Sequence, residues 1–144
     1  MADITEFIGE HFWLSNFYPS PVVLDDKVYP SVEHAYQAAK TLDITWREMI
    51  RGAKKAGQAK RMGRQVKIRA KWDLIKEGIM LELLRSKFGS LELRQKLIDT
   101  GDSRLVEGNY WGDIYWGVSR QIGKNRLGEL LMQVRMEILT SSGR

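Results

Sequence analysis

The sequence of 144 residues contains no cysteine and only two histidines, His11 and His34. Without cysteine the chain has no disulfide framework, no thiolate nucleophile and no thiolate metal ligand, which is compatible with a reducing cytosol. The two histidines do not form a paired ligand spacing such as HExxH, so the sequence gives metal catalysis little support. We expect no metal, no cofactor and a cytoplasmic location.

Long hydrophobic runs are also missing. No apolar stretch approaches the length of a membrane span, and residues 1–6 lack the basic and apolar regions of a signal peptide. The chain contains neither a GxSxG hydrolase motif nor a Walker phosphate-binding motif. We therefore expect no membrane partner. The length predicts one domain over residues 1–144, and 43% hydrophobic residues suffice for an ordinary core.

Positive charge is abundant and unevenly distributed. The formal net charge is +5, and between residues 47 and 76 only Glu48 and Asp73 oppose a long series of lysines and arginines. Such a segment can attract the phosphates of a small nucleotide or of a nucleic acid. The alternative is an ordinary solvated helical surface. The five tryptophans offer flat faces for core packing or for stacking on a base.

The pattern of apolar residues predicts an α+β fold that is mostly helical, with a few short strands. Residues 22–24 and 27–29 form a hairpin around the Asp25–Asp26 turn, although Asp-Asp is a weaker turn signal than Asp-Gly. Residues 12–19 are predicted to be an ordered loop, and residues 105–107 a short strand. Helices are predicted over residues 31–42, 44–52, 53–62, 69–88 and 91–98, and from residue 127 towards the C-terminus.

The stretch from Tyr29 to Lys40 combines a helix start with an unusual polar face. Ser31 is a good N-cap, which places Glu33 at the second helical position, where free backbone N–H groups and the macrodipole favour an anion. We expect this carboxylate to be ionised, so it suits a base or a cation stabiliser better than a proton donor. Glu33 shares one helical face with Tyr36, Gln37 and Lys40. The alternative is that Glu33 is only a capping residue.

Two further groups of residues fit the same chemistry. Glu107 and Asp113 lie near element ends, and paired carboxylates beside flat aromatic faces such as Trp116 suit cleavage of a glycosidic bond. The alternative is that these acids brace loops and the tryptophans belong to the core. Residues 123–128 could place backbone N–H groups and two cations at a helix start, forming a seat for phosphate. The alternative is that this segment is only a helix-entry turn with surface cations.

Several stretches, in their order and spacing, resemble the YbiA-like, or NADAR, family over nearly the whole chain. They are residues 14–18, 29–40, 62–64, 71–72, 80, 87–88, 105–107, 113–117 and 123–132. The resemblance implies a compact, mostly helical α+β domain without a metal, and an N-glycosidase activity. One branch of the family hydrolyses ribosylamino-pyrimidine 5′-phosphates of the riboflavin pathway and releases ribose 5-phosphate. Other members remove ADP-ribose from guanine bases, which would make nucleic acid a partner.

The resemblance also implies roles for single residues. It assigns catalysis to Glu33 and Asp113, and substrate contacts to Ser15, Asn16, Arg64, Trp72, Trp116, Lys124, Asn125 and Arg126. Ser15 and Asn16 could instead satisfy local backbone groups. Tyr36 is a further candidate for stacking on the base.

One segment departs from the riboflavin-linked pattern. Residues 110–112, Tyr-Trp-Gly, replace a polar segment, which leaves the substrate open without changing the chemistry. A non-catalytic binder of nucleotides or ADP-ribose is the remaining alternative, and the sequence specifies no oligomeric state.

Overall fold

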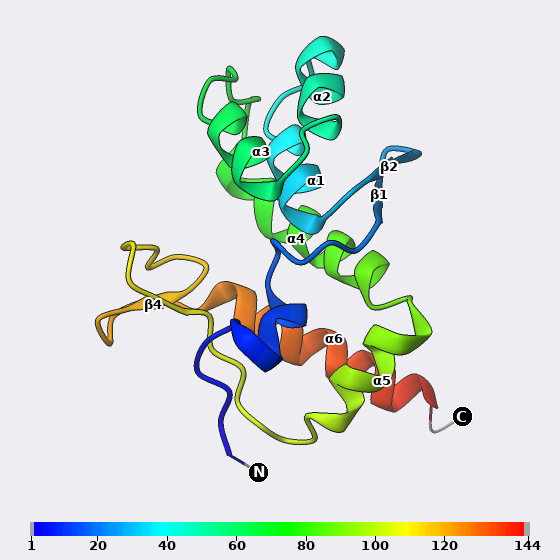
Figure 1. The fold of residues 1–144 in the computed structure, drawn as a ribbon, viewed down its shortest axis with the longest axis vertical. Coiled ribbons are helices and arrows are strands. Elements are labelled where there is room, and N and C mark those ends of the chain that lie inside the picture. Colours follow the sequence, from blue (N-terminus) through cyan, green and yellow to red (C-terminus); the bar gives the residue numbers. More distant parts are fainter. Residues whose placement is uncertain (1, 143–144) are drawn as a thin grey trace. The chain divides into compact units, whose positions relative to one another are not determined.

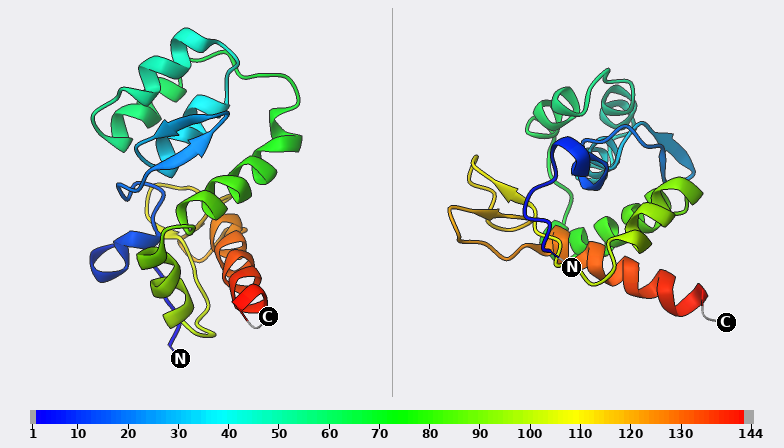
Figure 2. Two further views of the ribbon diagram at one scale, coloured as in Figure 1. Left: turned by 90° about the vertical axis from the view of Figure 1, so that its right-hand side faces the viewer. Right: turned by 60° about the horizontal axis from the view of Figure 1, so that its bottom comes forward.

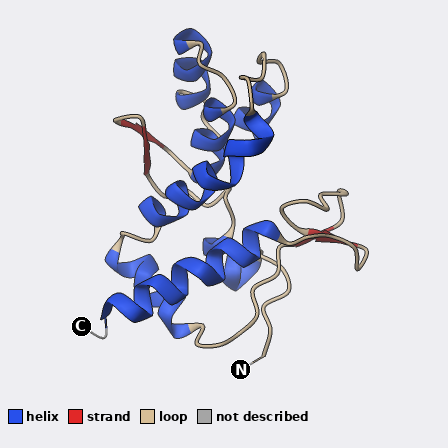
Figure 3. Ribbon diagram, turned by 180° about the vertical axis from the view of Figure 1, so that it is seen from behind, coloured by secondary structure: helices blue, strands red, loops and turns tan. Residues whose placement is uncertain are grey.

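The computed structural model describes residues 2–142. Helices form most of this part of the chain, with two pairs of short strands (Figure 3), so the predicted α+β class is confirmed. The chain divides into two compact units, unit 1 with Met1–Ser15 and Phe88–Arg144, and unit 2 with Asn16–Lys87. Figure 1 labels the elements within each unit.

Unit 2 begins with a β-hairpin and continues with helices. Its elements are β1 (Val22–Leu24), β2 (Lys27–Tyr29), α1 (Val32–Ala39), α2 (Ile44–Arg51), α3 (Ala56–Gly63) and α4 (Trp72–Lys87). The strands pair antiparallel (Figure 2), and Asp25 and Asp26 both have positive φ, 47° and 65°, as a type I′ turn requires. The Asp25 carboxylate also lies 2.6 Å from Nη1 of Arg47, which ties the turn to α2. The predicted hairpin is confirmed.

Helix α1 is the centre of unit 2. All eight of its residues are buried, and it packs against α2, α3, α4 and the hairpin. Ala35, Ala38 and Ala39 are fully buried, because their small side chains let neighbouring backbones approach closely. The predicted N-cap is confirmed, since Oγ of Ser31 accepts a hydrogen bond from the backbone N–H of His34 at 3.2 Å.

The other predicted helix limits shift by a few residues. Helix α1 ends at Ala39 rather than at residue 42, and α3 begins at Ala56 rather than at residue 53. Lys55 is extended before α3, and the Gln58 side chain accepts from its backbone N–H. Helix α4 begins at Trp72 rather than at residue 69, because Lys71 has a φ of 61° and interrupts the helical path.

Unit 1 is built on two helices, α5 (Leu91–Asp99) and α6 (Arg126–Ser142), which pack side by side (Figure 1). A 3₁₀ helix, η1 (Gly9–Leu14), buries Trp13 and Leu14. The predicted loop over residues 12–19 is therefore wrong for its first part, where aromatic burial fixes a helical turn. Trp13 meets Phe88 edge to face, with ring centroids 6.3 Å apart.

The short strands of unit 1 lie further along the chain than predicted. Strands β3 (Gly108–Asn109) and β4 (Val118–Ser119) pair parallel, whereas residues 105–107 contribute only an isolated bridge from Leu105 to Ile4. The strand predicted over residues 105–107 is wrong, because the backbone N–H of Glu107 donates to a side chain, Oδ1 of Asn125, instead of a neighbouring strand. Within residues 2–142 no helix is both long and apolar enough to cross a membrane.

Candidate active site

Glu33 is a buried carboxylate held by its own helix. It is 7% exposed and occupies the first turn of α1. Its backbone N–H donates to the carbonyl of Asn16 at 3.0 Å, and its Oε2 accepts from Nε2 of Gln37 at 2.6 Å. A donor one helical turn away stabilises the charged carboxylate and fixes its rotamer. The polar face predicted for this helix therefore carries an oriented acid.

Asn16 adds an unsatisfied acceptor beside this acid. Its Nδ2 lies 3.7 Å from Sδ of Met80, while its Oδ1 is buried without a hydrogen-bond partner in the described part of the chain. Oε1 of Gln37 is likewise buried without a hydrogen-bond partner in the part of the chain that the structure describes. An unpaired buried acceptor costs about 1–3 kcal/mol, and a ligand with hydroxyl or amino donors would remove that penalty at Asn16.

Tyr36 and Trp72 form an aromatic pair between α1 and α4. Their ring centroids are 5.3 Å apart and their planes are tilted by 52°. Each residue is only 7% exposed, so protein covers most of both faces. The pair consequently fixes the packing of α4 against α1, and only a small part of either ring is accessible for stacking on a base.

Lys40, at the end of α1, lies in a crowded positive environment. Its Nζ is 5.6 Å from the centroid of the Tyr36 ring. Burial lowers the pKa of Lys40, the charge of Glu33 raises it, and the charges of Lys60, Arg64 and Lys76 lower it further. The pKa of Lys40 is therefore governed by its burial and by the opposing effects of the Glu33 charge and these three positive charges.

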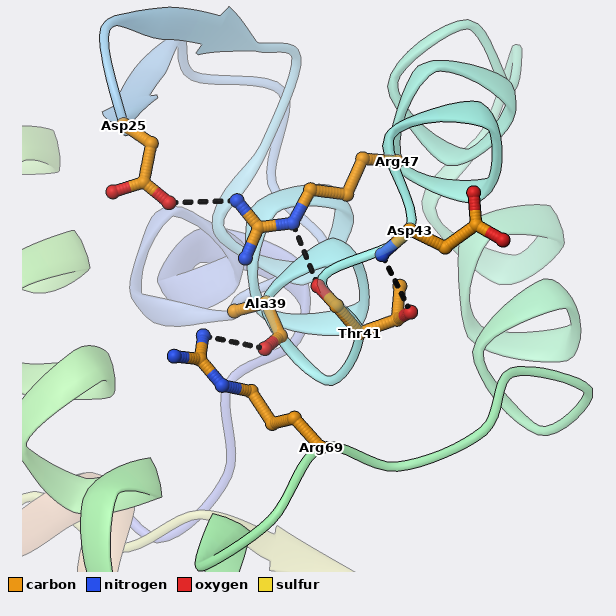
Figure 4. A network of polar contacts seen from close by, with 6 residues as sticks. All are labelled: Asp25, Ala39, Thr41, Asp43, Arg47 and Arg69. Atoms are coloured by element: carbon orange, nitrogen blue, oxygen red, sulfur yellow. Dashed lines mark hydrogen bonds and ion pairs between the residues drawn. The ribbon is translucent and has the colours of Figure 1, made fainter.

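Two arginines anchor the C-terminal end of α1 (Figure 4). Nε of Arg47 donates to the carbonyl of Thr41 at 2.7 Å, and Nη1 of Arg69 donates to the carbonyl of Ala39 at 3.4 Å. The backbone N–H of Arg69 also donates to the carbonyl of Lys40 at 2.8 Å. Cations at a helix C-terminus complement the macrodipole. These contacts end the helix at Ala39 and fix the backbone that carries Lys40.

His34 is a structural residue of α1. Its Nε2 donates to the carbonyl of Ala53 at 2.9 Å, and its Nδ1 lies 2.7 Å from Oγ of Ser31. A carbonyl only accepts, so this geometry assigns the proton to Nε2 and leaves Nδ1 as the acceptor. Both ring nitrogens are thereby engaged within the fold. Over the described residues, no three side chains of His, Asp or Glu gather as metal ligands do.

In unit 1, Asp113 organises a tight loop. Its Oδ1 accepts from the backbone N–H groups of Tyr115 at 3.1 Å and Trp116 at 2.9 Å. Asn109 closes the other side, with Nδ2 donating to the carbonyl of Asp113 and Oδ1 accepting from its N–H. The Trp116 ring is half-buried and meets the Tyr115 ring at 4.9 Å. Asp113 thus has a structural role that is compatible with a chemical one.

The expectation of a phosphate seat made of backbone N–H groups is wrong. The N–H groups of Lys124, Asn125, Arg126 and Leu127 donate to the carbonyls of residues 114, 117, 115 and 116 at 2.8–3.2 Å. They are therefore occupied by the preceding loop. The side chains of Lys124 and Arg126 stay candidates for binding an anion, and Nζ of Lys124 lies 5.5 Å from the centroid of the Tyr115 ring.

Both the nitrogen and the oxygen of the Asn125 side-chain amide form hydrogen bonds within the chain. Its Nδ2 donates to the carbonyl of Leu105 at 2.9 Å, and its Oδ1 accepts from the N–H of Glu107 at 2.9 Å. The residue is 1% exposed and has a φ of 52°, a region that asparagine tolerates better than most residues. The side chain of Asn125 therefore joins the residue before α6 to residues 105 and 107.

The predicted site residues fall into two sets. Asn16, Glu33, Tyr36, Arg64 and Trp72 lie in unit 2, and Ser15, Asp113, Trp116, Lys124, Asn125 and Arg126 lie in unit 1. Arg64 is exposed just after α3, and Ser15 is half-buried just after η1. Residues outside the predicted set are Gln37, Lys40, Lys60, Lys76 and Asn109. Gln37 and Lys40 carried a signal, because both share the helical face of Glu33, and the i, i+4 spacing of Gln37 also predicts a side-chain contact.

Comparisons with known proteins agree with this architecture. A model of the NADAR domain family matches residues 6–139. N-glycosidase YbiA of Escherichia coli (strain K12) is 42% identical over 128 residues, which cover 86% of this chain and 79% of YbiA. A riboflavin biosynthesis protein of Vibrio vulnificus is 36% identical over 132 residues, 89% of this chain and 36% of that protein.

A solved structure agrees with the fold as well. The NMR structure of E. coli YbiA superposes with a TM-score of 0.87 at 37% identity, covering 99% of this chain and 89% of the YbiA chain. The chain therefore belongs to the NADAR domain family and has the α+β fold of YbiA.

Proposed function

We propose that this N-glycosidase of the NADAR family hydrolyses the N-glycosidic bond of a ribosylamino-pyrimidine 5′-phosphate of the riboflavin pathway, releasing ribose 5-phosphate. The observation that carries the proposal is the buried Glu33 carboxylate, oriented by Gln37 at 2.6 Å and placed near cations that suit a phosphate. The names of the relatives, N-glycosidase and riboflavin biosynthesis protein, support the same choice. We further propose that units 1 and 2 act as one domain, because the NADAR match covers residues of both.

In the proposed reaction, the bond between C1′ of the ribose and the base nitrogen breaks, its electron pair leaves with the base, and the base gains a proton from solvent. The oxygen of a water molecule forms the new bond to C1′. Glu33 stabilises the positive charge that develops on the sugar and accepts a proton from the attacking water. Asp113 is the second carboxylate. Substrate contacts are proposed for Ser15, Asn16, Tyr36, Trp72 and Trp116, phosphate contacts for Arg64, Lys124 and Arg126, and a positioning role for Asn125.

A release assay tests the substrate directly. The protein is incubated with ribosylamino-pyrimidine 5′-phosphates and, separately, with ADP-ribosylated guanosine, and the free sugar phosphate is measured. We expect release of ribose 5-phosphate from the pyrimidine compounds. Release from ADP-ribosylated guanosine alone would transfer the proposal to that substrate. Tight binding without turnover on any N-riboside would instead identify a binding module.

The second candidate function is removal of ADP-ribose from guanine in nucleic acid. The observation that favours it is the exposure of Tyr110 and Trp111, 86% and 53%, since uncovered rings can stack on bases. If this function is correct, DNA binding should fall steeply as salt is raised. Absence of DNA binding at low salt would count against it.

Asp113→Asn separates the two roles of Asp113. Asparagine keeps an Oδ1 acceptor for the N–H groups of Tyr115 and Trp116, so the loop should survive, while the negative charge is lost. We expect kcat to fall by about 10²-fold or more, as for other positioned acid–base groups, with little change in the thermal unfolding temperature. Unchanged kcat in a folded variant would restrict Asp113 to bracing the loop.

A further inference from the structure

The side chain of Asn109 joins two acidic residues of unit 1, Glu107 and Asp113. Its Nδ2 lies 2.9 Å from the carbonyl oxygen of Asp113, 3.4 Å from the carbonyl oxygen of Glu107 and 3.3 Å from Oε2 of Glu107. Its Oδ1 accepts from the backbone N–H of Asp113 at 3.1 Å. One amide therefore holds the backbone of Asp113 at both its donor and its acceptor, and it also contacts the carboxylate of Glu107.

The surroundings determine the orientation of this amide. Three oxygen atoms face Nδ2 and one N–H group faces Oδ1, so the reversed orientation would set oxygen against oxygen and donor against donor. An aspartate would have the same shape, but it would place a carboxylate oxygen against two carbonyls and the carboxylate of Glu107. Position 109 therefore needs the donor of an asparagine and not only its shape.

Gly117 packs against the same group of atoms. A Cβ built on Gly117 would lie 2.7 Å from Nδ2 of Asn109, 2.4 Å from Oε2 of Glu107 and 2.2 Å from the carbonyl oxygen of Glu107. A residue without a side chain permits this close approach. Trp116, directly before Gly117, donates its backbone N–H to Oδ1 of Asp113 at 2.9 Å. The Trp116–Gly117 segment thus contacts Asp113 at one residue, and Glu107 and Asn109 at the next.

Asn109 closes an exposed loop over residues 109–113. Tyr110 in this loop is 86% exposed, and Gly112 has a φ of 88°. The backbone N–H of Gly112 donates to Oγ of Ser119 at 3.3 Å. Holding a short exposed loop in one conformation costs conformational entropy, which the hydrogen bonds of Asn109 to the far end of the loop offset. The placement of Asp113 therefore depends on a side chain four residues earlier.

We propose that Asn109 is a positioning residue, which holds Asp113 and the backbone of Trp116 in the geometry that cleavage of the glycosidic bond requires. It acts through Asp113 and touches no reacting atom. This inference rests on the proposed function, in which Asp113 is the second carboxylate. Positioning of this kind has a large effect on rate, because misplacing a catalytic group by about 1 Å can lower the rate about 10²-fold.

The variant Asn109→Asp tests the donor, because it exchanges an NH₂ group for an oxygen and keeps the shape. One oxygen can still accept the N–H of Asp113, while the other repels the oxygens that face Nδ2 in the native protein. We expect kcat for release of ribose 5-phosphate to fall about 10²-fold at neutral pH. Asn109→Ala, which removes the amide, should lower kcat by a similar factor.

The pH dependence of Asn109→Asp separates positioning from a purely structural role. Glu107 faces position 109 through its carboxylate, whereas Asp113 faces it through its backbone. The nearby charge of Glu107 favours the neutral form of the introduced carboxyl group and raises its pKa. Once protonated, this group is a donor again. The kcat of the variant, divided by that of the unmodified protein, should therefore rise as the pH is lowered.

Amide hydrogen exchange, followed by NMR, measures the loop without turnover. We expect the Asp113 N–H to exchange at least tenfold faster in Asn109→Ala than in the unmodified protein, because its acceptor is lost. The change should be confined to residues 112–116, with little change in the unfolding temperature. Gln121→Ala is the matched control. This exposed amide side chain lies in the turn between Ser119 and Ile122, and its removal should change neither exchange nor kcat.

Four outcomes would contradict parts of this scheme. Faster exchange at Asp113 with native kcat in Asn109→Ala would overturn the positioning role. Unchanged exchange in Asn109→Ala would show that Asn109 does not hold Asp113. If kcat of Asn109→Asp stays low at every pH and the unfolding temperature falls, Asn109 is a purely structural residue. If the unmodified protein hydrolyses no N-riboside, the proposed function fails, and exchange at Asp113 alone decides whether Asn109 holds the loop.

Discussion

Replacing Glu33 by glutamine is expected to lower kcat by about 10²–10⁴-fold, the usual contribution of a positioned acid–base group, while substrate binding stays nearly unchanged. The neutral amide can neither accept a proton from water nor offset the charge that develops on the ribose. Because glutamine retains an acceptor oxygen, the contact with Nε2 of Gln37, 2.6 Å in the native protein, can persist. Release of ribose 5-phosphate measures kcat, and calorimetry with ribose 5-phosphate measures binding.

The matched control is Glu48→Gln on α2. This residue is also a glutamate in a helix of unit 2, but its side chain is 44% exposed and pairs with Arg51 at 2.7 Å. An exposed pair of this kind contributes little to stability, so the variant should retain native activity. Near-native turnover in Glu33→Gln would remove Glu33 from the catalytic role. A parallel loss of binding and of the cooperative unfolding transition would instead identify it as a structural residue.

Local signals were sufficient to predict the part of the fold that carries Glu33. The Asp25–Asp26 turn needs only two residues that tolerate positive φ, and the start of α1 needs only the hydroxyl of Ser31. Each of these features depends on neighbours within about one helical turn, which a sequence displays directly.

Features set by distant contacts were not predicted correctly. The end of α1 depends on Arg47 and Arg69, which take the carbonyls near its C-terminus from other parts of unit 2. The start of strand β3 depends on Asn125. Because Oδ1 of Asn125 accepts the N–H of Glu107, this N–H forms no hydrogen bond to a neighbouring strand. The sequence leaves residues 123–128 open as a phosphate seat or a helix-entry turn, because it does not show that the carbonyls of 114–117 already bind the backbone donors of residues 124–127.

The same distinction applies to the candidate site. The contact between Glu33 and Gln37 follows from helical spacing alone. The contact between Asn16 and Met80 joins residues 64 positions apart. Charge density in the sequence indicates an attraction for phosphates, but it does not show how α3 and α4 pack on α1.

Replacing Gly63 by alanine is expected to reduce activity although the residue touches no substrate in the proposed mechanism. The new Cβ would lie 1.9 Å from Oε1 and 3.1 Å from Cβ of Gln37. Gln37 is 4% exposed, and its Oε1 belongs to the same planar amide as the Nε2 that contacts Glu33, so a shift of Oε1 also moves the group that holds the acid. Misplacing a catalytic group by about 1 Å can lower the rate about 10²-fold, and overpacking of this kind destabilises by about 1–3 kcal/mol. Steady-state kinetics and urea denaturation measure the two effects.

Gly57→Ala provides the control within the same helix. Gly57 also lies in α3, but a Cβ there meets no atom within 4 Å, so alanine should stabilise the helix by about 0.5–1 kcal/mol and leave kcat unchanged. If Gly63→Ala keeps native activity, Gln37 does not control the orientation of the Glu33 carboxylate. If both variants lose activity equally, the loss reflects the rigidity of α3. Loss of activity in Gly63→Ala alone would show that a glycine on α3 determines how the Glu33 carboxylate on α1 is held.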